Sequence, residues 1–504
     1  MAQAGVSGFG QQPRQRRGWG MWIFIGLVVA GLFYIGPKGY RAGNDLYQNF
    51  LERVKPTIKI SSPPVGIGVE PQQLTIEVGD SAAGLDQVVI RLEQGGNTKE
   101  LLKKNYAERT YADALALTLP GKDSGIQEGD AQLVVRVFDR SYWANGEQLV
   151  LPLKIDYKKP QLEVLTRQHY AAQGGVELVF YRVPKEEAVF SGVMVGEWLF
   201  PGFKAKELDA EFAKFPDVYF AFFPIPMELD VNAAKLKVFA RDQVGNLVTA
   251  TFNYQIRPRS FVEKKLELTD QFLEQKIEDL YPKFLELDQK TNGGPIRSGQ
   301  VGKTVAERVE QFRSINEKYR ALLEQSLIPL FQRPKRALYW EGVFGRMPNA
   351  AQQAGYGEKR FYSYQGESAG TSAHMGADLA SLAQSSVTAA NRGVVIFADD
   401  LGIYGNTVIL DHGFGLCTLY GHLSSLAVTE GNEVERNDIL GRSGATGLAG
   451  GDHLHFEIRL HGIPVTPFEW WDQKWIDDHV RNKIYEVKGA LGIQVLKPVG
   501  ERGF

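Results

Sequence analysis

Histidine and aspartate side chains in the last third of the chain are the residues best suited to chemistry. They fall in three short segments, His374-Met-Gly-Ala-Asp378, Tyr420-Gly-His422 and His453-Leu-His455. Seven of the eight histidines lie between residues 374 and 479, and the remaining one is His169. Because histidine is the commonest protein metal ligand and the usual base near neutral pH, this clustering predicts one metal-dependent active site within one domain.

The spacing of these residues indicates how they could share one metal ion. His453 and His455 lie two positions apart in an apolar segment, and on a β-strand such residues project from the same face. His374 and Asp378 add a nitrogen and an oxygen ligand. Two histidines and one carboxylate with an open fourth position are typical of a catalytic zinc, so His374, Asp378 and His455 are the candidate ligands. The isolated histidines are interpreted as satisfied core or surface residues: His169, His412, His461 and His479.

Composition and other motifs argue against several further classes of function. At 504 residues with 43% apolar and 23% charged residues, the chain is expected to form three or four globular domains. Its net charge of −2 argues against a nucleic-acid partner, which favours a basic face. Gly302-Lys-Thr304 resembles the end of a phosphate-binding loop, but Arg297 replaces the required glycine, so we expect no nucleotide binding. The single cysteine, Cys417, is interpreted as a small buried apolar residue.

The N-terminal region determines the expected location of the protein. Residues 19–36 contain an uncharged apolar run, Trp19 to Ile35, that approaches the length of a membrane span and follows three arginines. The positive-inside rule then places residues 1–18 in the cytoplasm and everything beyond a polar stalk, residues 37–60, across the membrane. We therefore predict a single-pass anchor in the inner (cytoplasmic) membrane and a periplasmic catalytic domain. A cleaved signal peptide is the alternative interpretation.

The middle of the chain reads as antiparallel β-structure. Short alternating apolar runs separated by turn residues predict two immunoglobulin-like β-sandwich modules, at residues 61–158 and 159–258. In each module a similar run, Val135-Arg-Val-Phe-Asp139 or Leu236-Lys-Val-Phe-Ala240, precedes an Asn/Gly turn and a second strand. We interpret both pairs as closing β-hairpins. The Phe- and Pro-rich residues 190–226 read as additional core or, alternatively, as a partner-binding surface.

Residues 259–332 change from strand to helical periodicity. Apolar residues recur at helical spacing, and Thr304-x-x-Glu307 is the signature of a capping box that opens a second helix. We therefore predict a helical hairpin. One interpretation is a linker whose apolar stripes pack on each other. The other is a regulatory arm that covers the active site or docks a partner protein, a role the sandwich modules could share.

Residues 333–472 are expected to form a β-rich domain that contains several ordered motifs: His374-x-x-x-Asp378, Tyr404-Gly-Asn-Thr-Val-Ile-Leu-Asp-His-Gly413, Leu419-Tyr-Gly-His-Leu423, Gly441-Arg-Ser-Gly-Ala-Thr-Gly447 and His453-Leu-His-Phe-Glu-Ile-Arg459. On these motifs residues 340–468 resemble the M23 metallopeptidases, the lysostaphin-like LytM domain. The family's Gly-x-Arg segment before His374 is only weakly matched by residues 356–361, and residues 473–504 have no assigned role.

The resemblance implies that His374, Asp378 and His455 bind Zn²⁺, while His422 and His453 are catalytic residues beside the metal-bound water. The family cleaves peptide cross-links of cell-wall peptidoglycan, so the implied activity is a zinc endopeptidase with peptidoglycan peptides as substrates. Two alternatives are a non-catalytic LytM-type scaffold that activates other wall hydrolases and a peptidase directed at envelope proteins. The expected fold is mainly β and multidomain, with a transmembrane helix, two sandwiches, a helical hairpin and the LytM-type domain.

Overall fold

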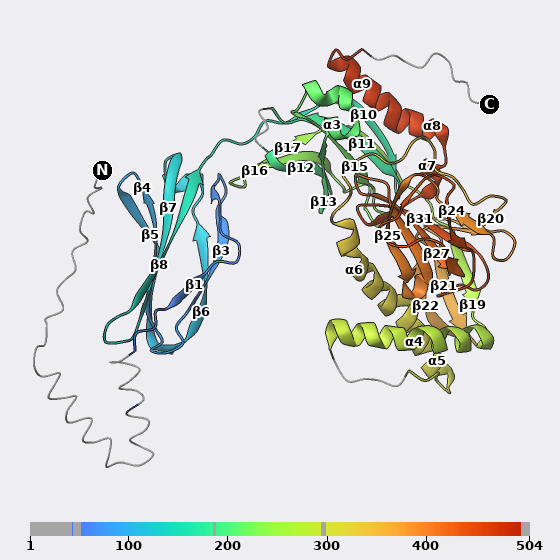
Figure 1. The fold of residues 1–504 in the computed structure, drawn as a ribbon, viewed down its shortest axis with the longest axis horizontal. Coiled ribbons are helices and arrows are strands. Elements are labelled where there is room, and N and C mark those ends of the chain that lie inside the picture. The colour runs from blue at the N-terminus through green and yellow to red at the C-terminus, as the bar shows by residue number, and fades with distance from the viewer. Residues whose placement is uncertain (1–42, 44–51, 185–187, 294–298, 495–504) are drawn as a thin grey trace, which may run out of the picture. The chain divides into compact units, whose positions relative to one another are not determined.

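A computed structural model describes residue 43 and residues 52–184, 188–293 and 299–494 (Figure 1). The predicted tail and anchor, residues 1–36, and much of the stalk lie outside the described residues. Among the residues described, no helix combines the length and apolar character needed to cross a membrane. The described chain is mainly β, and it divides into two compact units, Met1–Lys158 with Gln243–Asn246 and Lys159–Asp242 with Leu247–Phe504.

The first unit contains two sheets that share one apolar core. The sheets have the orders β2-β8-β7-β4-β5 and β1-β3-β6, and both send alternate side chains inward, such as Ile76 from β3 and Val135 from β7. Strands β7 and β8 pair antiparallel, as the predicted closing hairpin requires. The strands are β1 (Thr57–Lys59), β2 (Gly66–Ile67), β3 (Gln72–Gly79), β4 (Leu85–Gln94), β5 (Asn97–Thr110), β6 (Ala112–Leu119), β7 (Gly129–Asp139) and β8 (Gly146–Ile155).

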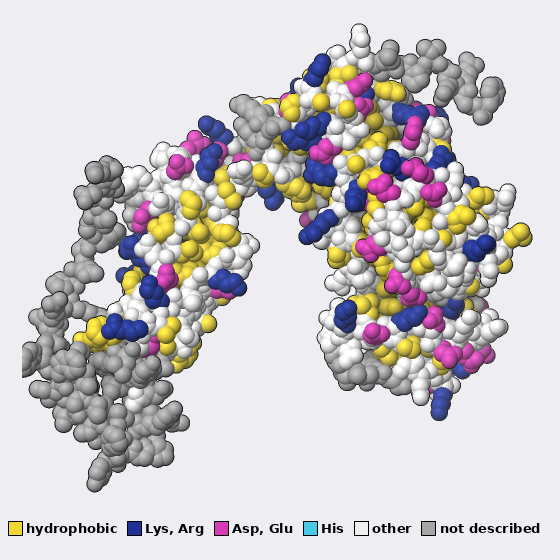
Figure 2. All heavy atoms as spheres, in the orientation of Figure 1, with side chains coloured by type: hydrophobic (Ala, Val, Ile, Leu, Met, Phe, Trp, Pro, Cys, Tyr) yellow, Lys and Arg dark blue, Asp and Glu magenta, His cyan; other side chains and the backbone are white. Residues whose placement is uncertain are grey.

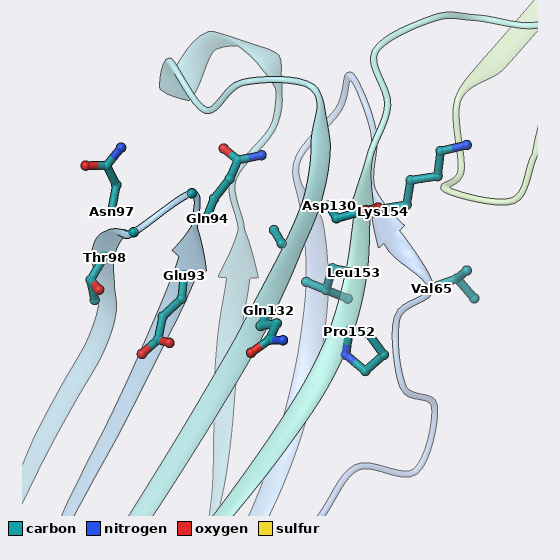
Figure 3. Close-up of a pocket in the computed structure, with 13 residues that line it drawn as sticks. Val65, Glu93, Gln94, Asn97, Thr98, Asp130, Gln132, Pro152, Leu153 and Lys154 are labelled. Carbon is teal, nitrogen blue, oxygen red and sulfur yellow. The ribbon is translucent and has the colours of Figure 1, made fainter. Parts of the chain in front are cut away.

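A hollow of about 850 Å³ lies in the first unit, where the β4–β5 turn meets β7 and β8. Figure 3 shows that the labelled side chains around it are mostly polar, among them Glu93, Gln132 and Lys154. None of its lining residues is a histidine or cysteine. On the face of the molecule seen in Figure 2, acidic and basic side chains are interspersed, in keeping with the net charge of −2.

The second sandwich begins the second unit and is joined to the C-terminal domain by a common core. Strands β11 (Val176–Arg182) and β15 (Val218–Pro224) are buried along nearly their whole length. Phe220 and Phe203 contact Phe414 at ring-centroid distances of 4.9 Å and 5.1 Å, and Phe222 contacts Trp340 at 6.4 Å. The phenylalanines between residues 190 and 226 therefore belong largely to core.

This sandwich is built from two four-stranded sheets, ordered β14-β15-β11-β9 and β13-β12-β16-β17, beside a two-stranded parallel pair, β10-β18. Strands β16 and β17 form the second predicted hairpin. The strands are β9 (Glu163–Val164), β10 (Gln168–Ala172), β11 (Val176–Arg182), β12 (Ala188–Val195), β13 (Trp198–Pro201), β14 (Phe203–Lys204), β15 (Val218–Pro224), β16 (Leu236–Asp242), β17 (Leu247–Thr251) and β18 (Asn253–Arg257).

The helical region packs on the C-terminal domain as well as on itself. It contains β19 (Glu263–Glu267), α4 (Asp270–Asn292), α5 (Val305–Arg313), a π-helical segment (Ser314–Tyr319) and α6 (Arg320–Phe331). Thr304 and Glu307 form the predicted capping box at the start of α5. Leu280 and Tyr319 share a core with Ile403 and Leu419 of the C-terminal domain, so the region is more than a self-packed linker.

The C-terminal domain is organised around an eight-stranded sheet, in which seven strands follow the order β20-β23-β31-β27-β26-β25-β29 and β32 pairs with β31. Two three-stranded sheets, β19-β21-β22 and β24-β30-β28, flank it. The strands are β20 (Ala351–Ala354), β21 (Lys359–Tyr364), β22 (Glu367–Ala373), β23 (Ala377–Ala380), β24 (Ser386–Thr388), β25 (Gly393–Asp400), β26 (Asn406–Asp411), β27 (Leu416–Leu423), β28 (Ser425–Leu426), β29 (Glu433–Val434), β30 (Ile439–Arg442), β31 (Leu454–Leu460) and β32 (Ile463–Val465).

The helices after the sheet return to the second sandwich (Figure 1). They are α7 (Pro467–Trp470), α8 (Gln473–Ile476), a π-helical segment (Asp477–Arg481) and α9 (Asn482–Ala490). Lys483 makes a buried ion pair with Glu177 of β11. Burial alone would raise the pKa of Glu177, but His479 and Lys483 keep this pKa below its usual value. Arg167 lies 3.8 Å from Glu486, so α9 also contacts the segment that precedes β10. The described part of the tail, which had no assigned role, is therefore structural.

The shared core predicts where the chain can be cut. A fragment of residues 333–504 loses the apolar partners of Leu419 and leaves Arg459 without the carboxylate of Glu324, and breaking a buried ion pair alone costs roughly 3–5 kcal/mol. We expect this fragment to aggregate or melt without cooperativity, whereas residues 159–504 melt cooperatively. Solubility and differential scanning calorimetry of both fragments test this, and a cooperative transition of 333–504 at the same temperature contradicts it.

Candidate metal centre

Strand pairing brings three candidate ligands together. In the antiparallel register of β23 and β31, Asp378 lies directly opposite His455, and His374 begins the short loop between β22 and β23. His374 Nε2 is 2.8 Å from Asp378 Oδ1 and 3.0 Å from His455 Nδ1, and His455 Nδ1 is 2.9 Å from Asp378 Oδ1. All three residues are buried, and their ligand atoms form the one group within the described chain suited to a metal ion.

His374 and His455 each make a hydrogen bond on the side of the ring away from Asp378. These bonds determine which ring nitrogen faces the Asp378 oxygen. His374 Nδ1 lies 2.9 Å from the carbonyl oxygen of Gly355, which can only accept, so Nδ1 carries the hydrogen and Nε2 keeps its lone pair. His455 Nε2 lies 2.8 Å from a carboxylate oxygen of Glu457, so in the neutral ring Nδ1 keeps the lone pair. Both lone pairs therefore converge on the Asp378 oxygen, which is the arrangement a metal ion requires.

The donor set fits zinc in chemistry and in size. Two neutral imidazoles and one carboxylate match a catalytic zinc site with one open position. Bonds of about 2.0–2.1 Å at tetrahedral angles separate ligand atoms by about 3.3 Å. The present separations of 2.8–3.0 Å need to open only by a few tenths of an ångström.

Asp378 is held ionised by its surroundings. Burial would raise the pKa of this carboxyl, but His374, His453 and His455 bring it well below its usual value. Its second oxygen accepts a hydrogen bond of 3.0 Å from Arg360 Nη2 on β21. Arg360 lies in the segment that only weakly matches the family's Gly-x-Arg pattern, and this contact was not predicted from the sequence.

His422 and His453 lie beside the ligand group, and in each ring Nδ1 faces a backbone carbonyl. Their Nδ1 atoms lie 2.9 Å and 2.8 Å from the carbonyl oxygens of Thr446 and Gly451, so each Nε2 is left as an acceptor. The two rings are 4.9 Å apart, and His453 Nε2 is 3.5 Å from Asp378 Oδ1. Burial and the neighbouring imidazoles lower the pKa of His422 well below its usual value, which keeps it neutral.

The backbone of His422 is unusual. Its φ of +64° lies in the left-handed region, which side chains other than glycine adopt at a cost. The backbone is thus locally strained at the end of β27, where the imidazole of His422 is directed toward the ligand group.

A cavity of about 160 Å³ is lined by these five side chains and by neighbours from four other parts of the second unit. Arg320 comes from α6, Arg360 and Tyr362 from β21, and Tyr404 from the turn before β26. The helical region therefore supplies part of the cavity wall. The remaining lining residues are Ile403, Leu448, Ala449 and Gly450.

A chain of buried charges connects His455 to α6. Glu457 Oε2 accepts a hydrogen bond of 2.6 Å from Arg459 Nε, and Arg459 donates to both carboxylate oxygens of Glu324 at 2.6 Å and 2.9 Å. Burial alone would raise the pKa of Glu457, but Arg459 and His455 hold it at about 2. The Tyr404 hydroxyl completes the group by donating to Glu324 at 2.7 Å.

The sequence alone indicates part of this chain of buried charges. His455, Glu457 and Arg459 alternate along β31 and so share one strand face. Glu324 lies more than a hundred positions away, and no local pattern connects it to them.

The isolated histidines and the cysteine lie outside the cavity. His412 is fully buried, with Nδ1 donating to the carbonyl of Arg392 at 2.6 Å and Nε2 2.7 Å from Thr418 Oγ1. Cys417 is buried, and burial raises the pKa of its thiol well above the usual value. Neither these residues nor His169, His461 and His479 line the cavity.

Comparison with known proteins places the family resemblance in this same region. Residues 372–467 match the sequence profile of peptidase family M23. The DD-carboxypeptidase/endopeptidase Mpg of Neisseria meningitidis is 43% identical over 94 residues, which are 19% of this chain and 22% of that protein. The peptidoglycan DD-endopeptidase ShyA of Vibrio cholerae is 38% identical over 93 residues, 18% of this chain and 22% of that protein.

A protein whose name describes an activator is also similar. The murein hydrolase activator EnvC of Escherichia coli is 39% identical over 84 residues, 17% of this chain and 20% of that protein. The chain thus spans about a fifth of the length of each of these relatives. The M23 similarity belongs to the C-terminal domain.

The ligand geometry predicts distinct metal contents for two histidine variants. His374→Ala removes one donor of the triangle and should lower the zinc content of the purified protein from about one ion per chain to near zero. His453→Ala leaves the triangle intact and should retain about one ion. Elemental analysis after dialysis measures both, with circular dichroism as the fold control. Equal zinc contents in the two variants would falsify this ligand assignment.

The buried charge chain predicts that α6 influences metal affinity. Glu324→Gln keeps the shape of the side chain but removes the charge opposite Arg459, which loosens the carboxylate that orients His455. Zinc affinity should fall by about 10–100-fold, the usual effect of losing a residue that orients a ligand. Competition with a chromophoric chelator measures this, and Glu310→Gln, an exposed glutamate of α5, is the matched control. A lower melting temperature with unchanged zinc affinity would show that Glu324 is only structural.

Proposed function

We propose that the M23-like C-terminal domain is a zinc endopeptidase that hydrolyses peptide cross-links of cell-wall peptidoglycan. The observation that carries the proposal is the convergence of three donor atoms within 3.0 Å of one another, beside two further imidazole nitrogens in one cavity. The similarity to a DD-carboxypeptidase/endopeptidase and to a peptidoglycan DD-endopeptidase supports the substrate class.

The residues of the chain account for the chemistry that amide hydrolysis requires. A Zn²⁺ ion held by His374, Asp378 and His455 would acidify a bound water and polarise the scissile carbonyl. The Nε2 atoms of His422 and His453 can each accept a proton, because both Nδ1 atoms are engaged with backbone carbonyls. Once protonated, either imidazole becomes a donor, which is what the leaving amine requires. These side chains can therefore move one proton from the attacking water to the amine without a protein nucleophile.

We further propose that the protein is a single-pass protein of the cytoplasmic membrane with its catalytic domain in the periplasm. The proposal is supported by the uncharged run from Trp19 to Ile35 and the arginines before it. Such an anchor keeps the domain close to the wall. The helical region and the sandwich modules then offer surfaces for a regulatory protein partner.

A non-catalytic role as an activator of other wall hydrolases is the second candidate. It is favoured by the similarity to the murein hydrolase activator EnvC. The complete set of His374, Asp378 and His455 with His422 and His453 favours catalysis instead, because an activator needs no metal donors.

The proposal predicts loss of hydrolysis in variants that retain zinc. His422→Ala and His453→Ala should each lower the rate by about 10²–10⁴-fold, the usual contribution of a general acid–base residue, without changing the zinc content. Cross-linked muropeptides incubated with the zinc-loaded chain and analysed by mass spectrometry give the rate. Treatment with a chelator should abolish cleavage, and added Zn²⁺ should restore it.

The same experiment separates the alternatives. A zinc-loaded wild-type chain that leaves muropeptides intact but accelerates a wall amidase would support the activator. Cleavage of casein in preference to muropeptides would support a peptidase directed at envelope proteins.

A further inference from the structure

Arg320 brings a positive charge from α6 into the cavity of the metal centre. It is the first residue of α6 and lines the cavity together with the candidate ligands and the two catalytic histidines. The proposed hydrolysis, as described above, does not use this side chain. Its position therefore calls for a separate explanation.

The side chain of Arg320 is held in place from behind. Its Nε donates to the carbonyl oxygen of Asn316 at 3.0 Å, and Nη2 donates to Asn316 Oδ1 at 3.3 Å. Asn316 is 1% exposed and donates in turn to the carbonyl of Thr371 on β22 at 2.9 Å. One turn further along α6, Glu324 is bound to Arg459 of β31. Both the helix and the guanidinium are thus fixed relative to the cavity.

The charge of Arg320 is not neutralised by the protein. The other guanidinium in the cavity, Arg360, contacts Glu358 at 2.9 Å and Asp378 at 3.0 Å. Arg320 makes no ion pair with any residue that the structure describes, and no described residue accepts from its Nη1.

The free edge of the guanidinium suits one class of ligand. Nη1 and the second hydrogen of Nη2 remain available as a planar pair of donors, and such a pair matches the two oxygens of a carboxylate. Apolar atoms of Ile403 and Leu448 share the cavity and reduce contact with water, which strengthens a charge-assisted bond. The cavity measures only about 160 Å³, so a carboxylate at Arg320 must lie a few bonds from the group at the metal ligands.

We propose that Arg320 binds a free carboxylate of the peptide substrate, close to the scissile bond, and so selects peptides that carry this charge. The inference rests on the proposed endopeptidase function and specifies its substrate class. A cross-linked peptide with a free α-carboxylate beside the scissile amide is the matching ligand. A peptide whose carboxylate is amidated lacks the charge and should be disfavoured.

The test uses two peptides that differ only in this group, a carboxylate in one and a primary amide in the other. In both, a methylene-amine replaces the scissile amide, so binding is measured without cleavage. Isothermal titration calorimetry with the zinc-loaded full chain should give about tenfold tighter binding of the carboxylate peptide, as expected for one charge-assisted bond. Arg320→Gln should make the two affinities equal, and Arg320→Lys should retain a smaller preference.

Two controls keep the outcome specific to Arg320. Arg313→Gln changes an arginine of the same helical region that does not line the cavity, and it should keep the wild-type preference. Zinc content and melting temperature of Arg320→Gln show whether the metal centre and fold persist. An unchanged preference in Arg320→Gln, or equal binding of both peptides by the wild type, overturns the inference.

Failure of the proposed function has a different signature. The same two peptides with ordinary scissile amides are incubated in parallel with the wild-type chain. Absence of cleavage with the binding preference intact contradicts the endopeptidase proposal and leaves the role of Arg320 supported. Cleavage of both peptides at equal kcat/KM contradicts the role of Arg320 alone.

Discussion

The antiparallel register of β23 and β31 is the constraint on which the candidate site depends. It sets Asp378 opposite His455, while β27 places Gly421 on the other side of His455. A slip of one residue in either pairing would turn these side chains to the opposite face of the sheet. The absence of a side chain at Gly421 matters here, because an added Cβ would lie 3.2 Å from the carbonyl of Tyr404 and 3.6 Å from the Cβ of His455.

The buried charges hold the side chains of the site in a fixed orientation. A buried ion pair is weak support for stability on its own, since desolvation offsets much of its attraction. In this protein Glu457, Arg459 and Glu324 form a chain of alternating charges. This chain orients the imidazole of His455 and holds α6 against β31. The same helix places Arg320 at the cavity, so support of the metal ligand and the shape of the cavity are set by one contact between elements distant in sequence.

Local patterns predicted the parts of the structure that depend on local physics. The capping box at Thr304 and the hairpin of β7 and β8 follow from turn and cap chemistry. The ligand group followed from the two-residue period of strands and from the motifs shared with family M23. The domain boundaries, the anchor and the identity of the metal remain predictions.

Several residues of the site could not be predicted from the sequence, because contacts between distant segments bring them there. Arg360, Glu324 and Arg320 reach the site through pairings of strands and helices that no short window contains. The Phe-rich strand β15 alternates between two apolar faces, and only the folded chain reveals that one of them contacts the C-terminal domain. The second sandwich and the helical region thus looked separable in sequence, although they share core with the domain that carries the ligands.

The return of the C-terminal helices to β11 has a topological consequence. Because Arg167 and Glu486 are neighbours, the beginning of the second unit lies close to its last described helix, α9. A short loop could join these two ends, and new termini could then be opened in an exposed turn elsewhere, giving a circular permutant with the same sheet. The order in which the strands are synthesised would change, while the packing around the ligands would stay as it is.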